Sequence, residues 1–126
     1  INNIVYFGVL KINDMNITNM NFEELAHKYF EFFSLGDLES LLKIYDKNIS
    51  LIDWNGQWVG SEKVLDINKS LFEDYSPKVE VKEIKEVGNR AYCLIEIKVA
   101  KEKLKIMDVI DFNNDGKIIK IEAFKG

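Results

Sequence analysis

The second half of the chain alternates apolar and polar side chains in four successive segments, and this pattern predicts β-strands. Short turn signals such as Gly88-Asn89 separate the segments, which favours antiparallel pairing of consecutive strands. The segments begin after Pro77 and cover Val79–Val87, Arg90–Ala100, Lys103–Phe112 and Lys117–Phe124.

The first half shows apolar residues at spacings of three and four, which is typical of amphipathic helices. Asn21 and Glu24 form a capping-box pattern ahead of a helix that ends near Gly36. Helices before antiparallel strands predict an α+β domain, with three helices on a curved antiparallel sheet. The remaining predicted elements are a helix Leu38–Tyr45 capped by Asp37, a strand Asn48–Trp54, and a helix Glu62–Phe72 capped by Ser61.

A chain of 126 residues, 47% of them apolar, is long enough for one domain with a single core. We expect that domain to cover residues 21–126. The first methionines are Met15 and Met20, so residues 1–20 are expected to be an N-terminal extension, either an arm or a segment foreign to the natural protein.

Charge and composition argue against several classes of partner. Seventeen basic and 21 acidic residues give a net charge of −4, and the lysines are scattered, so no nucleic-acid partner is expected. The longest apolar run, Ile4 to Leu10, is too short to span a membrane. Cys93 is the single cysteine and His27 the single histidine, so we expect a cytoplasmic protein with no disulfide, metal or cofactor.

Asp108 is the most informative candidate for a functional site, because it shares a predicted strand face with four large apolar residues. An ionised carboxylate is unfavourable there, so the group is expected to be protonated or paired. A protonated carboxyl donates a hydrogen bond. The alternative is a structural carboxyl with a satisfied partner. The four apolar neighbours on the face are Leu104, Ile106, Ile110 and Phe112.

Two further polar residues point toward the same interior. Tyr29 lies on the apolar stripe of the first helix, where it is either a core tyrosine or a hydrogen-bond donor. Asp53 ends the first strand with the parity of Leu51, and is either a catalytic base or a turn former before Asn55-Gly56. By the same parity, the walls of an apolar pocket are predicted to include Phe33, Trp54, Ile95, Ile106 and Ile121.

The opposite sheet face is predicted to be partly apolar, which favours a homodimer formed through this face. The alternative is that the N-terminal segment covers it. The residues concerned are Tyr92, Leu94, Met107, Val109, Ile118 and Phe124.

The chain resembles the NTF2-like superfamily, in its SnoaL-like and ketosteroid isomerase branch, from about Phe22 to Phe124. The resemblance rests on the run YFEFFSLGDLESLLKIYDKNISLIDWNGQWVGSEKV and on the ending DVIDFNNDGKIIKIEAF. It implies a cone-shaped fold. That fold hosts isomerases, cyclases, dehydratases, epoxide hydrolases and binding modules, so it does not select one function.

The resemblance to ketosteroid isomerase also implies roles for three residues. Tyr29 corresponds to the oxyanion tyrosine, Asp53 to the base, and Asp108 to the protonated aspartate for which that enzyme is the standard case. The chain departs from the family at Asn68, where a second tyrosine is usual, while Tyr45 is retained. It also departs at the pocket mouth, where Lys125 replaces a tryptophan and Trp54 replaces a proline.

Three functions remain open at this point. The first is an isomerase or cyclase that removes a proton next to the carbonyl of a small hydrophobic molecule. The second is a small-ligand-binding module without catalysis, and the third is a protein-interaction domain.

Overall fold

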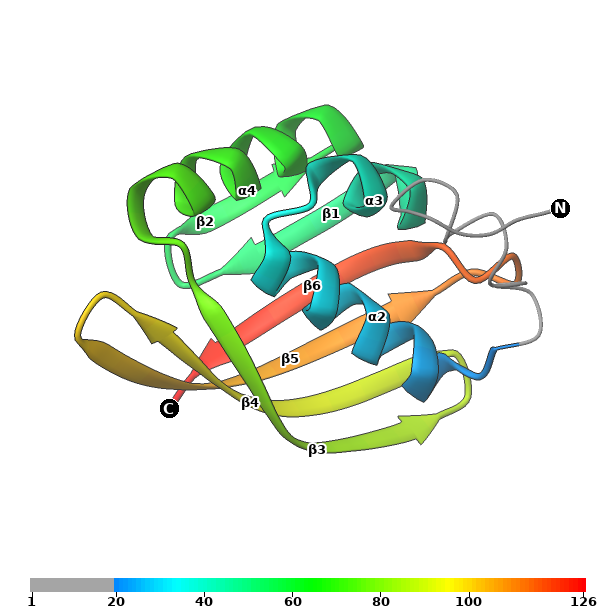
Figure 1. The fold of residues 1–126 in the computed structure, drawn as a ribbon. Helices are drawn as coiled ribbons and strands as arrows, with labels where there is room; N and C mark the ends of the chain where they lie inside the picture. The colour runs from blue at the N-terminus through cyan, green and yellow to red at the C-terminus, as the bar shows by residue number, and fades with distance from the viewer. Residues whose placement is uncertain (1–19) are drawn as a thin grey trace, which may run out of the picture.

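The computed structural model describes residues 20–126, so the predicted extension lies outside the described residues apart from Met20 (Figure 1). The chain begins with helices α2 (Phe22–Leu35) and α3 (Leu38–Ile44). Strands β1 (Tyr45–Asp53) and β2 (Gly56–Val59) and helix α4 (Ser61–Tyr75) follow. The second half contains β3 (Lys78–Val87), β4 (Arg90–Val99), β5 (Glu102–Phe112) and β6 (Ile118–Lys125).

The strands form one six-stranded sheet in the order β2-β1-β6-β5-β4-β3, and three helices pack on the concave side of its curve (Figure 1). This confirms the predicted α+β class. The sheet differs from the predicted antiparallel one in a single pairing among the described strands, because β1 pairs in parallel with β6. This pair joins the two halves of the chain. The two strands are not connected by a short turn, so the sequence contains no local signal for their pairing.

The predicted start and end of α2 are confirmed by hydrogen bonds. The Asn21 side chain accepts from the Glu24 N–H at 2.8 Å, and the Glu24 carboxylate accepts from the Asn21 N–H at 3.0 Å. The helix ends at Gly36, whose φ of 68° suits a residue without a Cβ. For α4 the predicted cap is wrong: Gly60 occupies the cap position without a side-chain bond, and Ser61 is the first helical residue.

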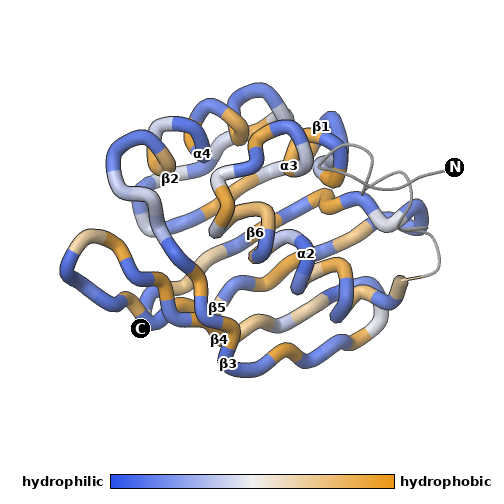
Figure 2. The backbone as a smooth tube through the Cα atoms, viewed as in Figure 1, coloured by the Kyte–Doolittle hydropathy of each residue, from blue (hydrophilic) through white to orange (hydrophobic). Residues whose placement is uncertain are grey.

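The alternation of hydrophobic and hydrophilic residues along β3, β4 and β5 is visible in Figure 2. It places alternate side chains in the core beneath α2 and on the outer face. One predicted outer residue, Ile118, is instead 1% exposed. Phe112 pairs with Ile118 but Asp111 pairs with Lys120, so Ile119 is an extra residue that shifts the parity of the strand.

Within residues 20–126, none of the helices combines the length and the apolar composition that crossing a membrane requires.

Candidate functional site

A cavity of about 390 Å³ lies between the sheet and helices α2 and α4. Its lining is mainly apolar, with a few polar groups from different elements. Tyr29 from α2, Asp53 from β1 and Asp108 from β5 all contribute to this lining. The structure therefore brings together the three polar residues that were singled out from the sequence.

Four of the five predicted wall residues line the cavity, namely Phe33, Trp54, Ile106 and Ile121. Ile95 does not: it is 1% exposed and packs in the core. On β4, the cavity is instead lined by Ile97 and Val99, nearer the end of the strand. Parity assigned Ile95 to the correct face, but parity alone does not fix the position along a strand at which a cavity opens.

Asp108 is 7% exposed and has no hydrogen-bond partner among residues 20–126. Its neighbours across the sheet are Cys93 on β4 and Ala123 on β6, and neither can neutralise a carboxylate. Burial, and secondly the charge of Asp53, raise the pKa of Asp108 to about 7. A large share of the molecules near neutral pH therefore has a protonated Asp108 that can donate a hydrogen bond into the cavity.

Asp53 is half-buried at the end of β1, opposite Gly56. One of its oxygens, Oδ1, accepts a hydrogen bond from the Asn55 N–H at 2.6 Å. The residue therefore shapes the turn, as one of the two interpretations of the sequence held. The same bond fixes the orientation of a carboxylate that also lines the cavity.

Tyr29 is buried, with its ring 5.0 Å from that of Phe30, 5.9 Å from that of Phe33 and 6.4 Å from that of Tyr45. Burial, followed by the charges that Tyr45 and Asp108 would carry, raises the pKa of Tyr29 well above its usual value. The hydroxyl therefore keeps its proton at any physiological pH and remains a donor.

A second polar pair, Tyr45 and Asn68, lies next to Tyr29. The Tyr45 hydroxyl donates to Asn68 Oδ1 at 2.6 Å, and both side chains are buried. Burial is the main reason that the pKa of Tyr45 is also raised. Asn68 additionally lines the cavity from α4.

The sequence interpretation missed β2 and the cavity residues of β2 and α4. The turn at Asn55-Gly56 joins β1 to β2, and Trp58, which pairs with Leu51, lines the cavity. An Asn-Gly pair after an alternating strand is a strong hairpin signal, so β2 was detectable. The missed residues of α4 are Ile67, Ser70, Leu71, Asp74 and Tyr75.

The described side chains that line the cavity include acidic residues but no basic ones. Among the described residues, the lining holds three aspartates and no lysine, arginine or histidine. Lys125 contacts a residue of this lining: its Nζ lies 5.1 Å from the centre of the Trp54 ring. Residues 20–126 contain no cluster of three acidic, histidine or cysteine side chains arranged for a metal ion.

Comparison with known proteins identifies relatives of this fold. A family model described as the SnoaL-like domain matches residues 26–121. No curated protein matches the chain in sequence.

Several solved structures are similar. An NTF2-like protein of unknown function from Cytophaga hutchinsonii has a TM-score of 0.76 at 14% identity, over 86% of this chain and 92% of that chain. A protein from Kribbella flavida, proposed to be a ketosteroid isomerase, has a TM-score of 0.77 at 16% identity, over 83% and 77%. A protein from Jannaschia, proposed to be a SnoaL-like polyketide cyclase, has a TM-score of 0.73 at 16% identity, over 82% and 84%. Identities this low establish the fold alone.

Proposed function

The chain belongs to the SnoaL-like domain family, and on that premise we propose that it is a cytoplasmic enzyme acting on the carbonyl of a small hydrophobic molecule. It removes a proton next to the carbonyl, in a reaction of the isomerase or cyclase type. The observation that carries the proposal is Asp108, a buried carboxyl without a partner in the described chain, which faces the cavity that Asp53 and Tyr29 also line. Buried polar groups without partners are rare in folded proteins, and function is one accepted reason for them.

The chemistry follows from the positions of the three residues. The Asp53 carboxylate takes a proton from the carbon next to the carbonyl, and the electron pair moves onto the carbonyl oxygen. Tyr29 and neutral Asp108 donate hydrogen bonds to that oxygen as its charge develops. Loss of one such donor typically costs about 10²–10³ in rate. Return of the proton to another carbon completes an isomerisation. Attack of the enolate carbon on a second carbonyl of the same molecule closes a ring instead, and the alkoxide formed there takes the proton back from Asp53.

The lining of the cavity supports an uncharged substrate. A volume of about 390 Å³ suits a small molecule. The described lining has no basic residue, so it offers no cation to pair with a carboxylate or a phosphate group of a substrate. The surrounding walls are aromatic and aliphatic, which favours a hydrophobic skeleton.

Exchange of carbon-bound hydrogen tests the proposal directly. We expect wild type to catalyse deuterium incorporation next to the carbonyl of small cyclic ketones in D₂O, followed by NMR. Asp53→Asn should lower the rate by at least about 10²-fold, because the base is lost. Asp74→Asn is the matched control, since Asp74 lines the same cavity from α4 but is exposed. Equal rates in wild type and Asp53→Asn would contradict the proposal.

The hydrogen bond from the Asn55 N–H to Asp53 favours one alternative, a binding module without catalysis. The bond gives Asp53 a role in shaping the turn that does not depend on catalysis. The same assay separates the two functions. A binding module would take up the ketone, as judged by line broadening, without any exchange of hydrogen.

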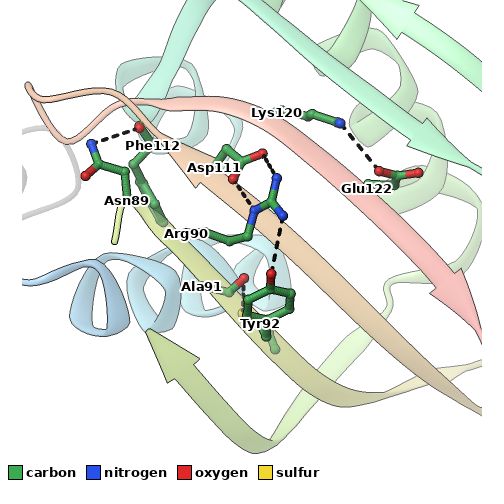
Figure 3. A network of polar contacts seen from close by, with 9 residues as sticks. Asn89, Arg90, Ala91, Tyr92, Asp111, Phe112, Lys120 and Glu122 are labelled. Atoms are coloured by element: carbon green, nitrogen blue, oxygen red, sulfur yellow. Dashed lines mark hydrogen bonds and ion pairs between the residues drawn. The ribbon is translucent and has the colours of Figure 1, made fainter. Parts of the chain in front are cut away.

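We also propose that the protein forms a homodimer through the outer face of the sheet. Leu94, Met107 and Phe124 lie side by side across β4, β5 and β6, and Phe124 is 51% exposed. On the same face, beyond the Tyr92–Val109 pair, Arg90 forms an ion pair with Asp111 (Figure 3). Sedimentation should give a dimer for wild type and a monomer for Phe124→Lys, and a wild-type monomer at micromolar concentration would refute this part.

A further inference from the structure

Asn68 is a polar residue in a position where apolar ones are usual. It is 4% exposed in the middle of α4, where Val64, one turn earlier, is the other buried residue. Asparagine is rarely buried to this extent. A single hydrogen bond to Tyr45 accounts for only its oxygen, so its amide nitrogen needs a separate explanation.

The orientation of this amide is fixed by Tyr45. The tyrosine hydroxyl donates to Asn68 Oδ1 at 2.6 Å, which turns the oxygen of the carboxamide toward β1. The nitrogen lies on the other side of the planar group and carries two N–H donors. Within residues 20–126 these donors have no acceptor, and the side chain lines the cavity. The structure thus holds a buried donor beside the space that a ligand would fill.

This donor lines the same cavity as the other two. The ring of Tyr45, which holds Asn68, is 6.4 Å from the ring of Tyr29, and Tyr29 and Asp108 line the same cavity as Asn68. We propose that Asn68 is a third hydrogen-bond donor of the cavity and selects ligands that carry two neighbouring oxygen atoms. A compound with two carbonyls on either side of one carbon is the matching substrate class, and this inference rests on the proposed function.

The chemistry of that class agrees with the residues. A second carbonyl makes the hydrogen between the two more acidic, which suits a carboxylate base such as Asp53. The resulting enolate spreads its charge over two oxygens. Tyr29 and neutral Asp108 donate hydrogen bonds to one oxygen, and the Asn68 amide donates to the other. No additional cation is needed to hold the second oxygen, in keeping with the described lining.

The preference for two neighbouring oxygen atoms can be measured with a pair of aromatic ligands that differ by one hydroxyl group. We expect wild type to bind 2,3-dihydroxynaphthalene about fivefold to tenfold more tightly than 2-naphthol, by fluorescence titration, because one more hydrogen bond forms. Asn68→Leu keeps the size of the side chain and removes the donor. The ratio of the affinity for 2,3-dihydroxynaphthalene to that for 2-naphthol should then fall close to one. The affinity for 2-naphthol should stay unchanged, and this would also show that the variant is folded.

Two further variants complete the test. Ser70→Ala changes another polar residue that α4 contributes to the lining, and it should leave the ratio as in wild type. Tyr45→Phe removes the hydrogen bond to the Asn68 oxygen, so the amide is no longer held in one orientation. The ratio of the two affinities should then fall between the wild-type value and one. This variant replaces Asn68→Leu in the test if Asn68→Leu does not fold. Equal loss of both ligands in Asn68→Leu, or a wild-type ratio near one, would overturn the inference.

The outcomes also separate this inference from the proposed function. A normal ratio without hydrogen exchange would refute catalysis and support Asn68 as a binding residue. Hydrogen exchange with a ratio near one would support catalysis and refute the role of Asn68.

Discussion

Asp108 and Asp111 lie three residues apart on β5, on opposite faces of the sheet, and their surroundings differ in every respect that matters for a carboxylate. Asp111 is on the outer face, where its two oxygens accept hydrogen bonds from Arg90 at 2.6 and 3.0 Å (Figure 3). Arg90 is its direct partner across the sheet. Asp108 is on the inner face, opposite Cys93, with no partner in the described chain.

The difference shows what an unpaired buried carboxyl costs. The pKa of Asp108 is raised from 3.8 to about 7, mainly by burial. Ionising the group inside the protein is therefore about 4 kcal/mol less favourable than in water. An aspartate with a purely structural role would be stabilised by a partner such as Arg90, as Asp111 is. We therefore infer that Asp111 is an ion-pair partner of Arg90 on the outer face, whereas Asp108 serves the cavity.

The largest expected effect is on the pH dependence of stability. Because the folded pKa of Asp108 is raised, the native state binds more protons than the unfolded state between about pH 4 and pH 7. The Asp108 contribution to the free energy of unfolding should therefore fall as pH rises through that window and level off above it. Asp108→Leu should gain about 2–4 kcal/mol over wild type at pH 8.

Urea denaturation at pH 5 and pH 8 measures this effect. The difference between the variant and wild type should be larger at pH 8 than at pH 5. Asp111→Leu is the matched control on the same strand and should lower stability instead of raising it. Parallel pH curves for wild type and Asp108→Leu would remove the distinction between the two aspartates.

The next effect concerns ligand affinity. A planar oxyanion such as a naphtholate should bind more tightly than a neutral analogue of the same shape, because Tyr29 and Asp108 donate to it. Asp108→Asn should keep much of this binding, since an amide still donates a hydrogen bond. Asp108→Leu should lose about 1.5–3 kcal/mol, the range for a hydrogen bond to a charged group. Equal affinity across all three proteins in a fluorescence titration would make Asp108 a structural residue.

The smallest effect is expected on the outer face. Asp111→Asn weakens a partly exposed ion pair, and such pairs add little to stability because solvent and salt screen them. We expect a slight loss of stability that shrinks further at 1 M NaCl, with naphthol affinity unchanged. A loss of naphthol affinity in Asp111→Asn would show that the two faces of β5 are coupled, and would contradict the separation of roles between Asp108 and Asp111.

Alternation in the sequence predicted much of this contrast. It put Asp108 on the inner face of β5 with Ile106 and Ile110, and it put Asp53 at the inward-facing end of β1. Such patterns report which face a side chain takes, because side chains in a strand alternate with a period of two. They do not report what lies opposite the residue across the sheet. That Asp108 has no partner within residues 20–126 was therefore visible only in the structure.

The features that were missed depend on long-range geometry. The parallel pairing of β1 with β6 joins segments that are far apart in the chain. The extra residue at Ile119 reversed the expected face of Ile118. The contribution of α4 to the cavity depends on how that helix packs over β1, which its own sequence does not state. Asn68 was recognised as a departure from the family, but its bond to Tyr45 came from the structure.

Direct titration of Asp108 tests the central claim of a carboxyl that is protonated near neutral pH. Protein labelled with ¹³C at aspartate Cγ can be followed by NMR from pH 3 to pH 9, and the Asp108→Asn variant assigns the resonance. We predict a midpoint near pH 7 for Asp108, because burial disfavours the charged form. A midpoint near pH 4, the ordinary range for aspartate, would contradict it.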